Sequence, residues 1–239
     1  MRFWLIVCTV LLGVQLVSAQ KEKPMNYRKF DQRLFHFGFM LGGNTSDYAM
    51  FQKLDAYNQY GLIDMYTEAQ PGGQLGILTS IKLGTPIVRL RFIPTLSFQE
   101  RVVKQLFRDP MGLDPKGILN EERINSTSLD FPLMLQFRTL RVNNFAAYCL
   151  FGAQYSLDLQ SQEKATQQFD DPFLKIRKHD FHGQVGLGVE YFAPFFKFGV
   201  ELKYSHSFKN GLIQDETRVS IPIERLYNRG WWISFIFEG

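Results

Sequence analysis

The chain has 239 residues, of which 45% are hydrophobic and 15% aromatic, and its formal net charge at pH 7 is +4. Its length allows one large or two small domains. The mean hydropathy of −0.15 excludes a bundle of membrane-spanning helices, and the lack of a basic run or basic helical stripe argues against nucleic acid as a partner. A β-barrel stays open, because its alternating strands average out in any hydropathy value.

The first 19 residues have the pattern of a cleaved export signal. Arg2 provides the positive start, residues 3–17 an apolar core, and Val17-Ser18-Ala19 a small-residue cleavage site. We therefore expect the mature chain to begin at Gln20, with an uncleaved membrane anchor as the alternative. Only Cys149 remains after cleavage, so we expect no disulfide within the chain.

Alternation of apolar and polar residues predicts a single β domain over residues 34–239. It follows a polar stretch, residues 20–33, that we expect to be a flexible periplasmic lead-in. The clearest alternation begins at Phe181, where every second residue up to Tyr191 is apolar or glycine, and a period of two places such residues on one face of a sheet. Eight strands are predicted, at 34–44, 74–84, 88–99, 129–138, 145–158, 181–191, 196–205 and 230–237.

The connections between these strands alternate in length. Those after the second, fourth and sixth strands are a few residues long, whereas the others, about 45–73, 100–126, 159–180 and 207–229, are long and polar. Pro94 lies within the third strand and cannot donate to the ladder, so it predicts a bulge or local break. Short periplasmic turns and long external loops are the plan of an up-and-down transmembrane β-barrel. A secreted β-sandwich is the competing fold, but it does not explain the one-sided loop lengths.

An eight-stranded antiparallel barrel has an interior that its own side chains fill. Charges on the inner face must pair, because an unpaired charge is costly away from water. We expect Glu190 and Glu201 to neutralise some of the inner cations in a plug that stabilises the fold, in preference to a conducting or proton-relaying path. The predicted interior charges are Lys82, Arg89, Arg91, Arg138, Glu190, Lys197, Glu201 and Lys203.

Aromatic residues recur in the long polar connections. Aromatic rings bury a large area at low entropic cost, which suits a docking surface. The alternative, which we weigh equally, is that these rings pack the loops together or lie in the lipopolysaccharide boundary. The candidate docking residues are Tyr57, Tyr60, Tyr66, Phe169 and Phe173.

Signals for catalysis are weak. Asp180, His182, Ser205 and His206 lie at the loop ends of two neighbouring predicted strands, where they could meet as in a lipid-active barrel enzyme. Such residues often occur together by chance, and the histidines lack metal-ligand spacing. We therefore expect no catalytic, cofactor or metal site.

Three stretches resemble PorT-type outer-membrane barrels. Leu-Phe-His-Phe-Gly-Phe at 34–39 with Leu-Gly-Gly-Asn-Thr at 41–45 resembles the opening strand of that family. Phe-Pro-Leu-Met-Leu at 131–135 with Asn-Asn-Phe at 143–145 resembles its central hairpin, and Ile-Pro-Ile-Glu-Arg-Leu at 221–226 with Ile-Ser-Phe-Ile-Phe-Glu-Gly at 233–239 its closing segment. Two departures are Ile221, where the family pattern has asparagine, and the unusual pair Trp231-Trp232.

The resemblance implies a place in the type IX (Por) secretion apparatus, which exports proteases and adhesins and supports gliding in some bacteria. PorT-type proteins are required for that export without a known catalytic activity, and no family site residues transfer to this chain. The implied partners are outer-membrane lipid or lipopolysaccharide and other type IX components. A stand-alone structural or adhesive barrel and a lipid-active barrel enzyme remain the alternatives, since fold does not fix function.

Overall fold

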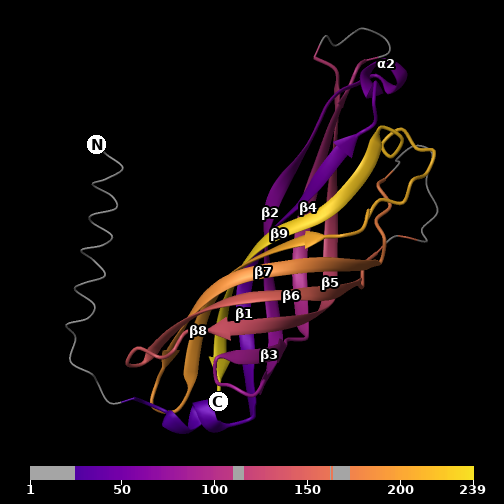
Figure 1. The fold of residues 1–239 in the computed structure, drawn as a ribbon. Coiled ribbons are helices and arrows are strands. Elements are labelled where there is room, and N and C mark those ends of the chain that lie inside the picture. Colours follow the sequence, from indigo (N-terminus) through magenta and orange to yellow (C-terminus); the bar gives the residue numbers. More distant parts are fainter. Residues whose placement is uncertain (1–24, 110–115, 162, 164–172) are drawn as a thin grey trace, which may run out of the picture.

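The computed structural model describes residues 25–109, 116–161, 163 and 173–239. The predicted signal peptide, residues 1–19, and Phe169 lie outside them. Within the described residues, nine strands form one antiparallel sheet (Figure 1). They are β1 (Phe35–Gln52), β2 (Leu62–Lys82), β3 (Val88–Phe92), β4 (Thr95–Phe107), β5 (Ile118–Arg138), β6 (Phe145–Asp158), β7 (His179–Phe192), β8 (Lys197–Ser207) and β9 (Ile223–Glu238).

The sheet closes on itself, because β1 pairs with both β2 and β9. Strands β3 and β4 together form one wall of the ring between β2 and β5. They are separated at Ile93 and Pro94, where Ile93 N donates to Pro132 O at 3.3 Å and Pro94 O accepts from Ile77 N at 3.0 Å. The predicted eight-stranded up-and-down barrel is therefore confirmed, and so is the break at Pro94.

The outer face of the barrel is apolar. Phe37, Ile77 and Leu187 are between 63% and 68% exposed, which is the reverse of a soluble core. Such an apolar band, flanked by aromatic rings near both ends, suits contact with lipid. Ring pairs of this kind lie 4.8–5.1 Å apart, with Tyr155–Phe181 and Tyr204–Trp231 toward the long connections, and Phe39–Phe237, Phe145–Tyr191 and Phe198–Phe237 toward the short turns.

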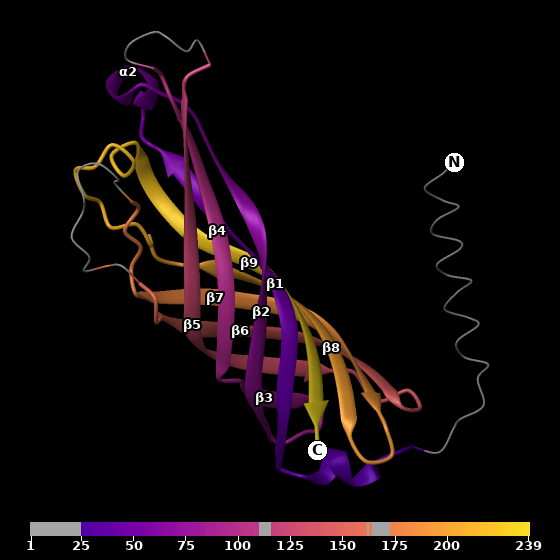
Figure 2. The same ribbon diagram turned by 180° about the vertical axis from the view of Figure 1, so that it is seen from behind.

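The predictions of long loops at 45–73 and 100–126 are largely wrong. The strands β1, β2, β4 and β5 continue into these segments, so that two hairpins extend well beyond the rest of the sheet (Figure 2). The hairpin of β1 and β2 ends in a short helix, α2 (Ala56–Tyr60). Here polar side chains hold neighbouring strands together, as where Lys104 Nζ lies 2.6 Å from Glu68 Oε1. We call residues 47–69, 101–109 and 116–125 the outer extension.

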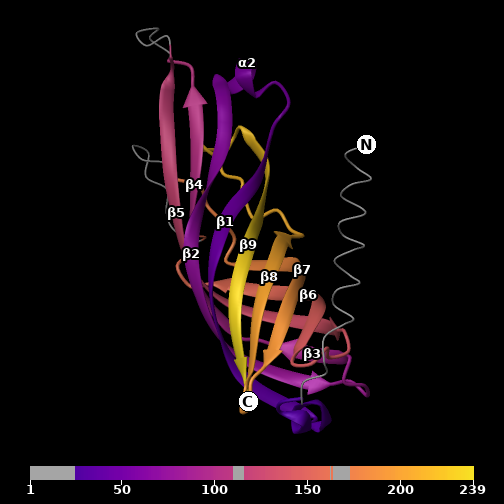
Figure 3. The same cartoon turned by 90° about the vertical axis from the view of Figure 1, so that its left-hand side faces the viewer.

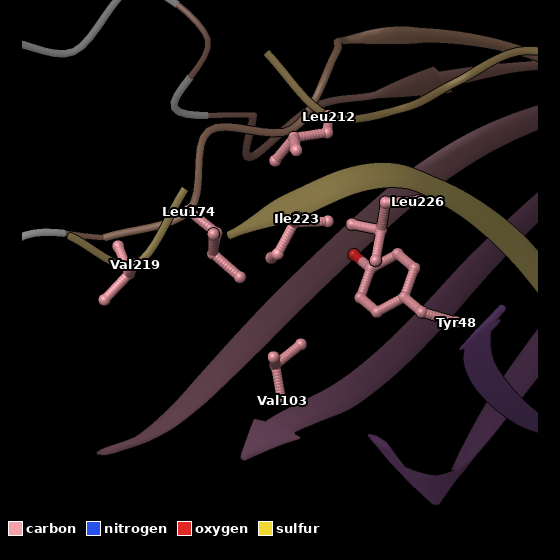
Figure 4. Packing of buried hydrophobic residues seen from close by; sticks show 7 residues of the cluster. All are labelled: Tyr48, Val103, Leu174, Leu212, Val219, Ile223 and Leu226. Atoms are coloured by element: carbon pink, nitrogen blue, oxygen red, sulfur yellow. The ribbon is translucent and has the colours of Figure 1, made fainter. Parts of the chain in front are cut away.

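A cluster of apolar side chains lies at the outer end of the barrel. Tyr48, Val103, Ile223 and Leu226 come from strands, and they pack against side chains of the segments that follow β6 and β8 (Figure 4). Strand β9 begins at Ile223, seven residues before its predicted start. The cluster joins the base of the outer extension to the connecting segments, and its remaining members are Leu174, Leu212 and Val219.

The opposite end carries a short 3-10 helix, η1 (Arg28–Gln32), next to the start of β1 (Figure 3). Phe30 of this helix is fully buried. The prediction of a flexible lead-in is therefore wrong for this part of residues 20–33, because an aromatic side chain anchors it to the barrel. Among the described residues, no helix is long and apolar enough to cross a membrane.

Candidate functional site

The middle of the barrel interior is organised around Glu201 on β8. Its Oε1 accepts a hydrogen bond from Tyr148 Oη at 2.6 Å and is paired with Arg91, while its Oε2 lies 3.5 Å from Lys203 Nζ. Gly188 makes room for the Tyr148 ring, because a Cβ built there would lie 2.6 Å from Tyr148 Oη. The fully buried carboxylate is thus held by two cations and a hydroxyl group.

A second group of charges lies toward the short turns. Lys197 Nζ lies 2.7 Å from Glu190 Oε1 and 2.8 Å from Glu238 Oε1, so one ammonium group joins two carboxylates. Glu190 also accepts from Gln136 at 2.7 Å and lies 3.6 Å from Arg138. Because Arg91 Nη2 lies 3.5 Å from Glu238 Oε1, the two groups form one connected network.

The structure buries seven of the eight predicted interior charges. The exception is Lys82, which lies at the rim of the barrel, where its Nζ donates to Gln32 O at 3.1 Å. Two acids of the network are not among the predicted interior charges: Glu238, the last residue of β9, and Asp31 of η1. The seven buried residues, between 0% and 5% exposed, are Arg89, Arg91, Arg138, Glu190, Lys197, Glu201 and Lys203.

Helix η1 covers the network at the end of the barrel that carries the short turns. The Phe30 ring stacks on His36 with a centroid separation of 3.6 Å, and Lys197 Nζ and the Arg89 guanidinium lie 4.8 and 5.2 Å from its centre. Arg89 has no hydrogen-bond acceptor among the described residues, and its guanidinium lies over the Phe30 ring, where a cation–π contact is favourable.

Asp31 fixes η1 to the barrel. Its two carboxylate oxygens lie 2.6 Å from Arg138 and 3.1 Å from Arg141. Burial alone would raise the pKa of Asp31, but the hydrogen bonds and charges of the two arginines outweigh it and lower this pKa below its ordinary value. Arg141 also donates to Asn26 O at 2.6 Å, so it holds both η1 and the segment just before it.

A polar cavity lies above the network, toward the outer extension. It is lined by serine hydroxyls, amides and a few charged side chains, among them Ser128, Gln154 and Arg101. Its volume is about 40 Å³, which suits a few water molecules. Below it, the interior is occupied by paired side chains. The arrangement is that of a filled barrel and leaves no room for an organic substrate to pass.

Two of the four residues considered for catalysis meet in this cavity. His182 Nε2 lies 3.2 Å from Asp180 Oδ2, and Asp180 also accepts from Ser207 at 2.6 Å. Ser205 instead accepts from Trp232 Nε1 at 2.9 Å, and the His206 ring lies beside the aromatic rings of Tyr204 and Tyr227. The four residues therefore do not form one constellation. The described residues also contain no group of three His, Cys, Asp or Glu placed to hold a metal.

The candidate docking aromatics occupy different environments. Tyr57 and Tyr66 are 47% and 43% exposed, and each carries a cation over its ring, Arg108 at 4.6 Å and Lys104 at 5.9 Å. Tyr60 packs against the small apolar cluster of Ala56, Leu62 and Phe107. Phe173 is half-buried. A role in docking stays a prediction for all of them.

A closed antiparallel ring with an apolar outer face and a filled, charged interior defines a small outer-membrane β-barrel. The chain belongs to the family described as outer membrane protein beta-barrel domain, whose model matches residues 18–212. It is a protein of the outer membrane.

Three solved barrels are similar in structure. OprG from Pseudomonas aeruginosa matches with a TM-score of 0.43 and 16% identity, over 86% of this chain and 94% of that one. Neisserial surface protein A gives 0.40 and 7%, over 84% and 95%. The N-terminal barrel domain of Pseudomonas aeruginosa OprF gives 0.32 and 12%, over 83% and 96%. No curated protein matches the chain in sequence.

Proposed function

We propose that this protein is a non-enzymatic, non-conducting barrel that supports protein export through the type IX secretion apparatus, and that its outer extension docks other components. The observation that carries the docking role is the contrast between the two parts of the molecule. The interior is filled by an ion-pair network and covered by η1. Four strands, in contrast, continue beyond the membrane barrel.

The link to type IX secretion rests on the resemblance to PorT-type barrels. The resembling segments lie in β1, in the β5–β6 hairpin and around β9, which are parts of the barrel wall. None of them lies at the tip of the outer extension. The resemblance thus supports a shared membrane anchor, and the extension is the part in which a specific partner of this chain would be encoded.

A stand-alone structural or adhesive barrel is the second candidate, and one observation favours it. The tip of the extension exposes apolar side chains that no neighbour covers in the isolated chain, with Leu54 92%, Phe51 53% and Leu119 53% exposed. Apolar groups exposed in this way are typical of a surface that binds another molecule. An adhesive barrel would use the same surface against a host or a neighbouring cell.

A clean deletion separates the two candidates. Cargo proteins that carry the type IX signal are assayed in the medium and in the periplasm, in the deletion strain and after return of the intact gene. Accumulation of cargo in the periplasm that the intact gene reverses supports the role in export. Normal secretion together with reduced surface binding contradicts it and supports the adhesive barrel.

Two variants of the gene, each introduced into the deletion strain, then test the outer extension. Leu54→Ser changes the exposed tip, whereas Leu187→Ser makes the same change at an exposed leucine of the membrane wall. Barrel assembly is checked for both by the heat-dependent shift on SDS gels. If the extension docks partners, Leu54→Ser assembles fully and restores export only in part. Full export with Leu54→Ser would place the docking surface elsewhere.

A further inference from the structure

Strand β5 has one neighbour along its outer half and two along the rest of its length. It pairs with β4 from Ile118 to Asp130, but its pairing with β6 begins only at Ser128. Among the described residues, no strand lies beside residues 118–127 on the β6 side. Figure 3 shows the outer half of β5 at the margin of the sheet with β4 next to it. This stretch is an open sheet edge outside the membrane.

The direction of the backbone groups at this edge follows from hydrogen bonds farther along β5. On the β3 side, Pro132 O accepts from Ile93 N and Arg138 N donates to Ile87 O, so even-numbered residues point there. On the β6 side, Thr127 O accepts from Leu159 N at 2.8 Å, so odd-numbered residues point there.

The same parity holds throughout the outer half of β5. The register between β4 and β5 is continuous from Ile118 to Asp130, without a bulge. Since backbone groups two residues apart point the same way in a strand, four residues present both N–H and C=O to the open edge. They are Leu119, Glu121, Arg123 and Asn125.

A groove lies beside this edge. Its volume is about 260 Å³, and it is lined by Arg123 and Asn125 of β5 on one side and by Gln160 and Leu174 on the other. Adjacent strands of a sheet lie about 4.8 Å apart, so a strand added to β5 would run along this side of it. Among the described residues after β6, Leu159 N donates to Thr127 O at 2.8 Å and Leu174 N donates to the Glu122 carboxylate at 2.6 Å, but none of them forms a strand along the edge.

We propose that this open edge binds an extended segment of another protein as an additional β-strand. A row of N–H and C=O groups at a two-residue spacing is matched best by the main chain of another strand, which is the basis of strand addition. The inference rests on the docking role proposed above and assigns it to one edge of the outer extension.

The side chains along the edge define what the added strand carries. Leu119, Glu121 and Arg123 share the outward face, and Arg123 is paired with Glu121 at 3.0 Å and with Glu100 at 3.3 Å. Opposite charges across neighbouring strands are favourable. The occupant is therefore an extended segment with a basic residue opposite Glu121, an acidic one opposite Arg123 and an apolar one near Leu119.

A second copy of this chain fits the edge poorly. Two copies in one membrane run their β5 strands in the same direction, because both outer extensions face outward. Pairing in register would then place Glu121 beside Glu121 and Arg123 beside Arg123, and like charges in facing positions are unfavourable. The charges in the middle of the edge thus act against self-association, as they do on many exposed edge strands.

The test uses the full-length protein in living cells. The photoreactive residue p-benzoylphenylalanine replaces Asn125, and irradiation captures whatever lies along the edge. Arg123→Pro removes an N–H group from the edge while leaving the bonds to β4, whereas Arg123→Gln removes the charge and keeps the N–H. We expect an adduct with one other protein, mapped by mass spectrometry to an extended segment. Its yield should fall at least tenfold with Arg123→Pro and less than threefold with Arg123→Gln.

Four results would overturn the inference: no adduct, an adduct with a second copy, a link to the chain's own segment after β6, or equal adduct yields in the two variants. Assembly of each variant is checked by the heat-dependent shift on SDS gels. If Arg123→Pro fails to assemble, Glu121→Pro makes the same test two residues away.

The same strains separate this inference from the proposed role in secretion. If deletion of the gene leaves secretion normal while the edge-dependent adduct still forms in the intact strain, the role in export is contradicted and strand addition at the edge is supported. If deletion abolishes secretion but no adduct forms at the edge, the role in export is supported and strand addition at the edge is overturned.

Discussion

The carboxylate of Asp31 and the guanidinium of Arg138 lie 2.6 Å apart, although the two residues are separated by 107 positions in the sequence. Asp31 belongs to η1, which precedes the barrel, and Arg138 is the last residue of β5. The segment ahead of the barrel thus supplies a counter-ion to an arginine of the barrel interior. This contact holds η1 at the end of the barrel that carries the short turns.

The first prediction concerns Asp31→Asn. Arg138 and Arg141 lose a shared carboxylate, so we expect η1 to detach more often, at a cost of about 1–2 kcal/mol for a pair that is only partly buried. Amide hydrogen exchange of residues 27–32 should become about tenfold faster. Asp55→Asn at the tip of the outer extension is the control and should leave this exchange unchanged.

The contact between Asp31 and the arginines also sets a pH dependence. Because the pKa of Asp31 is lowered in the folded protein, its contribution is fully present above the ordinary aspartate pKa of about 3.9 and is lost as the pH falls through the lowered pKa. Protection of η1, corrected for intrinsic exchange, should stay constant from about pH 7 to 5 and fall below about pH 4. A fall between pH 7 and 5 would contradict this assignment, and Asp31→Asn should show no such dependence.

The second prediction concerns Glu238→Gln in the barrel interior. The change leaves Lys197 and Arg91 with one carboxylate fewer in a site that water does not reach, which should cost about 2–4 kcal/mol. Urea unfolding of the barrel in lipid vesicles measures this loss. Glu224→Gln is the control, because Glu224 pairs with Arg225 at the surface, and it should leave the unfolding midpoint in place. Equal midpoints for the two variants would show that the network does not stabilise the barrel.

The third prediction concerns conductance. In planar bilayers the purified protein should produce no stepwise channel currents, because Lys197, Glu190 and their partners fill the interior. Removal of residues 25–32 should not open it, since the ion pairs of Arg91 with Glu201 and Glu238 remain above η1. Discrete openings of the intact protein would contradict a filled interior.

The fourth prediction tests the premise of the open edge. In the purified protein, amides of Leu119, Glu121, Arg123 and Asn125 should exchange with solvent much faster than those of Asn120, Glu122 and Ile124, whose N–H groups point toward β4. Residue-resolved exchange by NMR in micelles measures this alternation. Uniform protection along residues 119–125 would mean that the edge is already covered in the isolated protein.

Much of the barrel wall could be predicted because lipid imposes a strict pattern on it. Strand β6 has the predicted bounds, from Phe145 to Asp158, although Tyr148 interrupts its alternation by pointing inward. Most interior charges could be placed in the same way, since an Arg or Glu within an apolar strand has only the inner face available. Near Pro94, the chemistry of one residue was enough to place the break.

The strands of the outer extension were not predicted, because they lack the strict pattern that lipid imposes on the barrel wall. Between Asp64 and Ala69 and between Glu121 and Asn125, polar residues follow one another without a period of two, and only Met65 and Ile124 pack against the apolar cluster. Asp31 was missed because a five-residue 3-10 helix carries no periodic signal that could link it to Arg138. The alternation of the last strand places Glu238 on the inner face with Trp232 and Ser234, but it is not among the predicted interior charges because it lies one residue beyond the predicted strand end.

The connection of Lys197 and Arg91 through Glu238 has a consequence for insertion into the membrane. Lys197 and Glu238 lie opposite each other on the neighbouring strands β8 and β9, whereas Arg91 of β3 reaches Glu238 only when β1 and β9 have joined. Apolar side chains on the outer face can move from water into lipid one strand at a time. The charges of this network, in contrast, lose their hydration together when β1 pairs with β9. An intermediate in which β1 and β9 are still apart must therefore keep its concave side in contact with water.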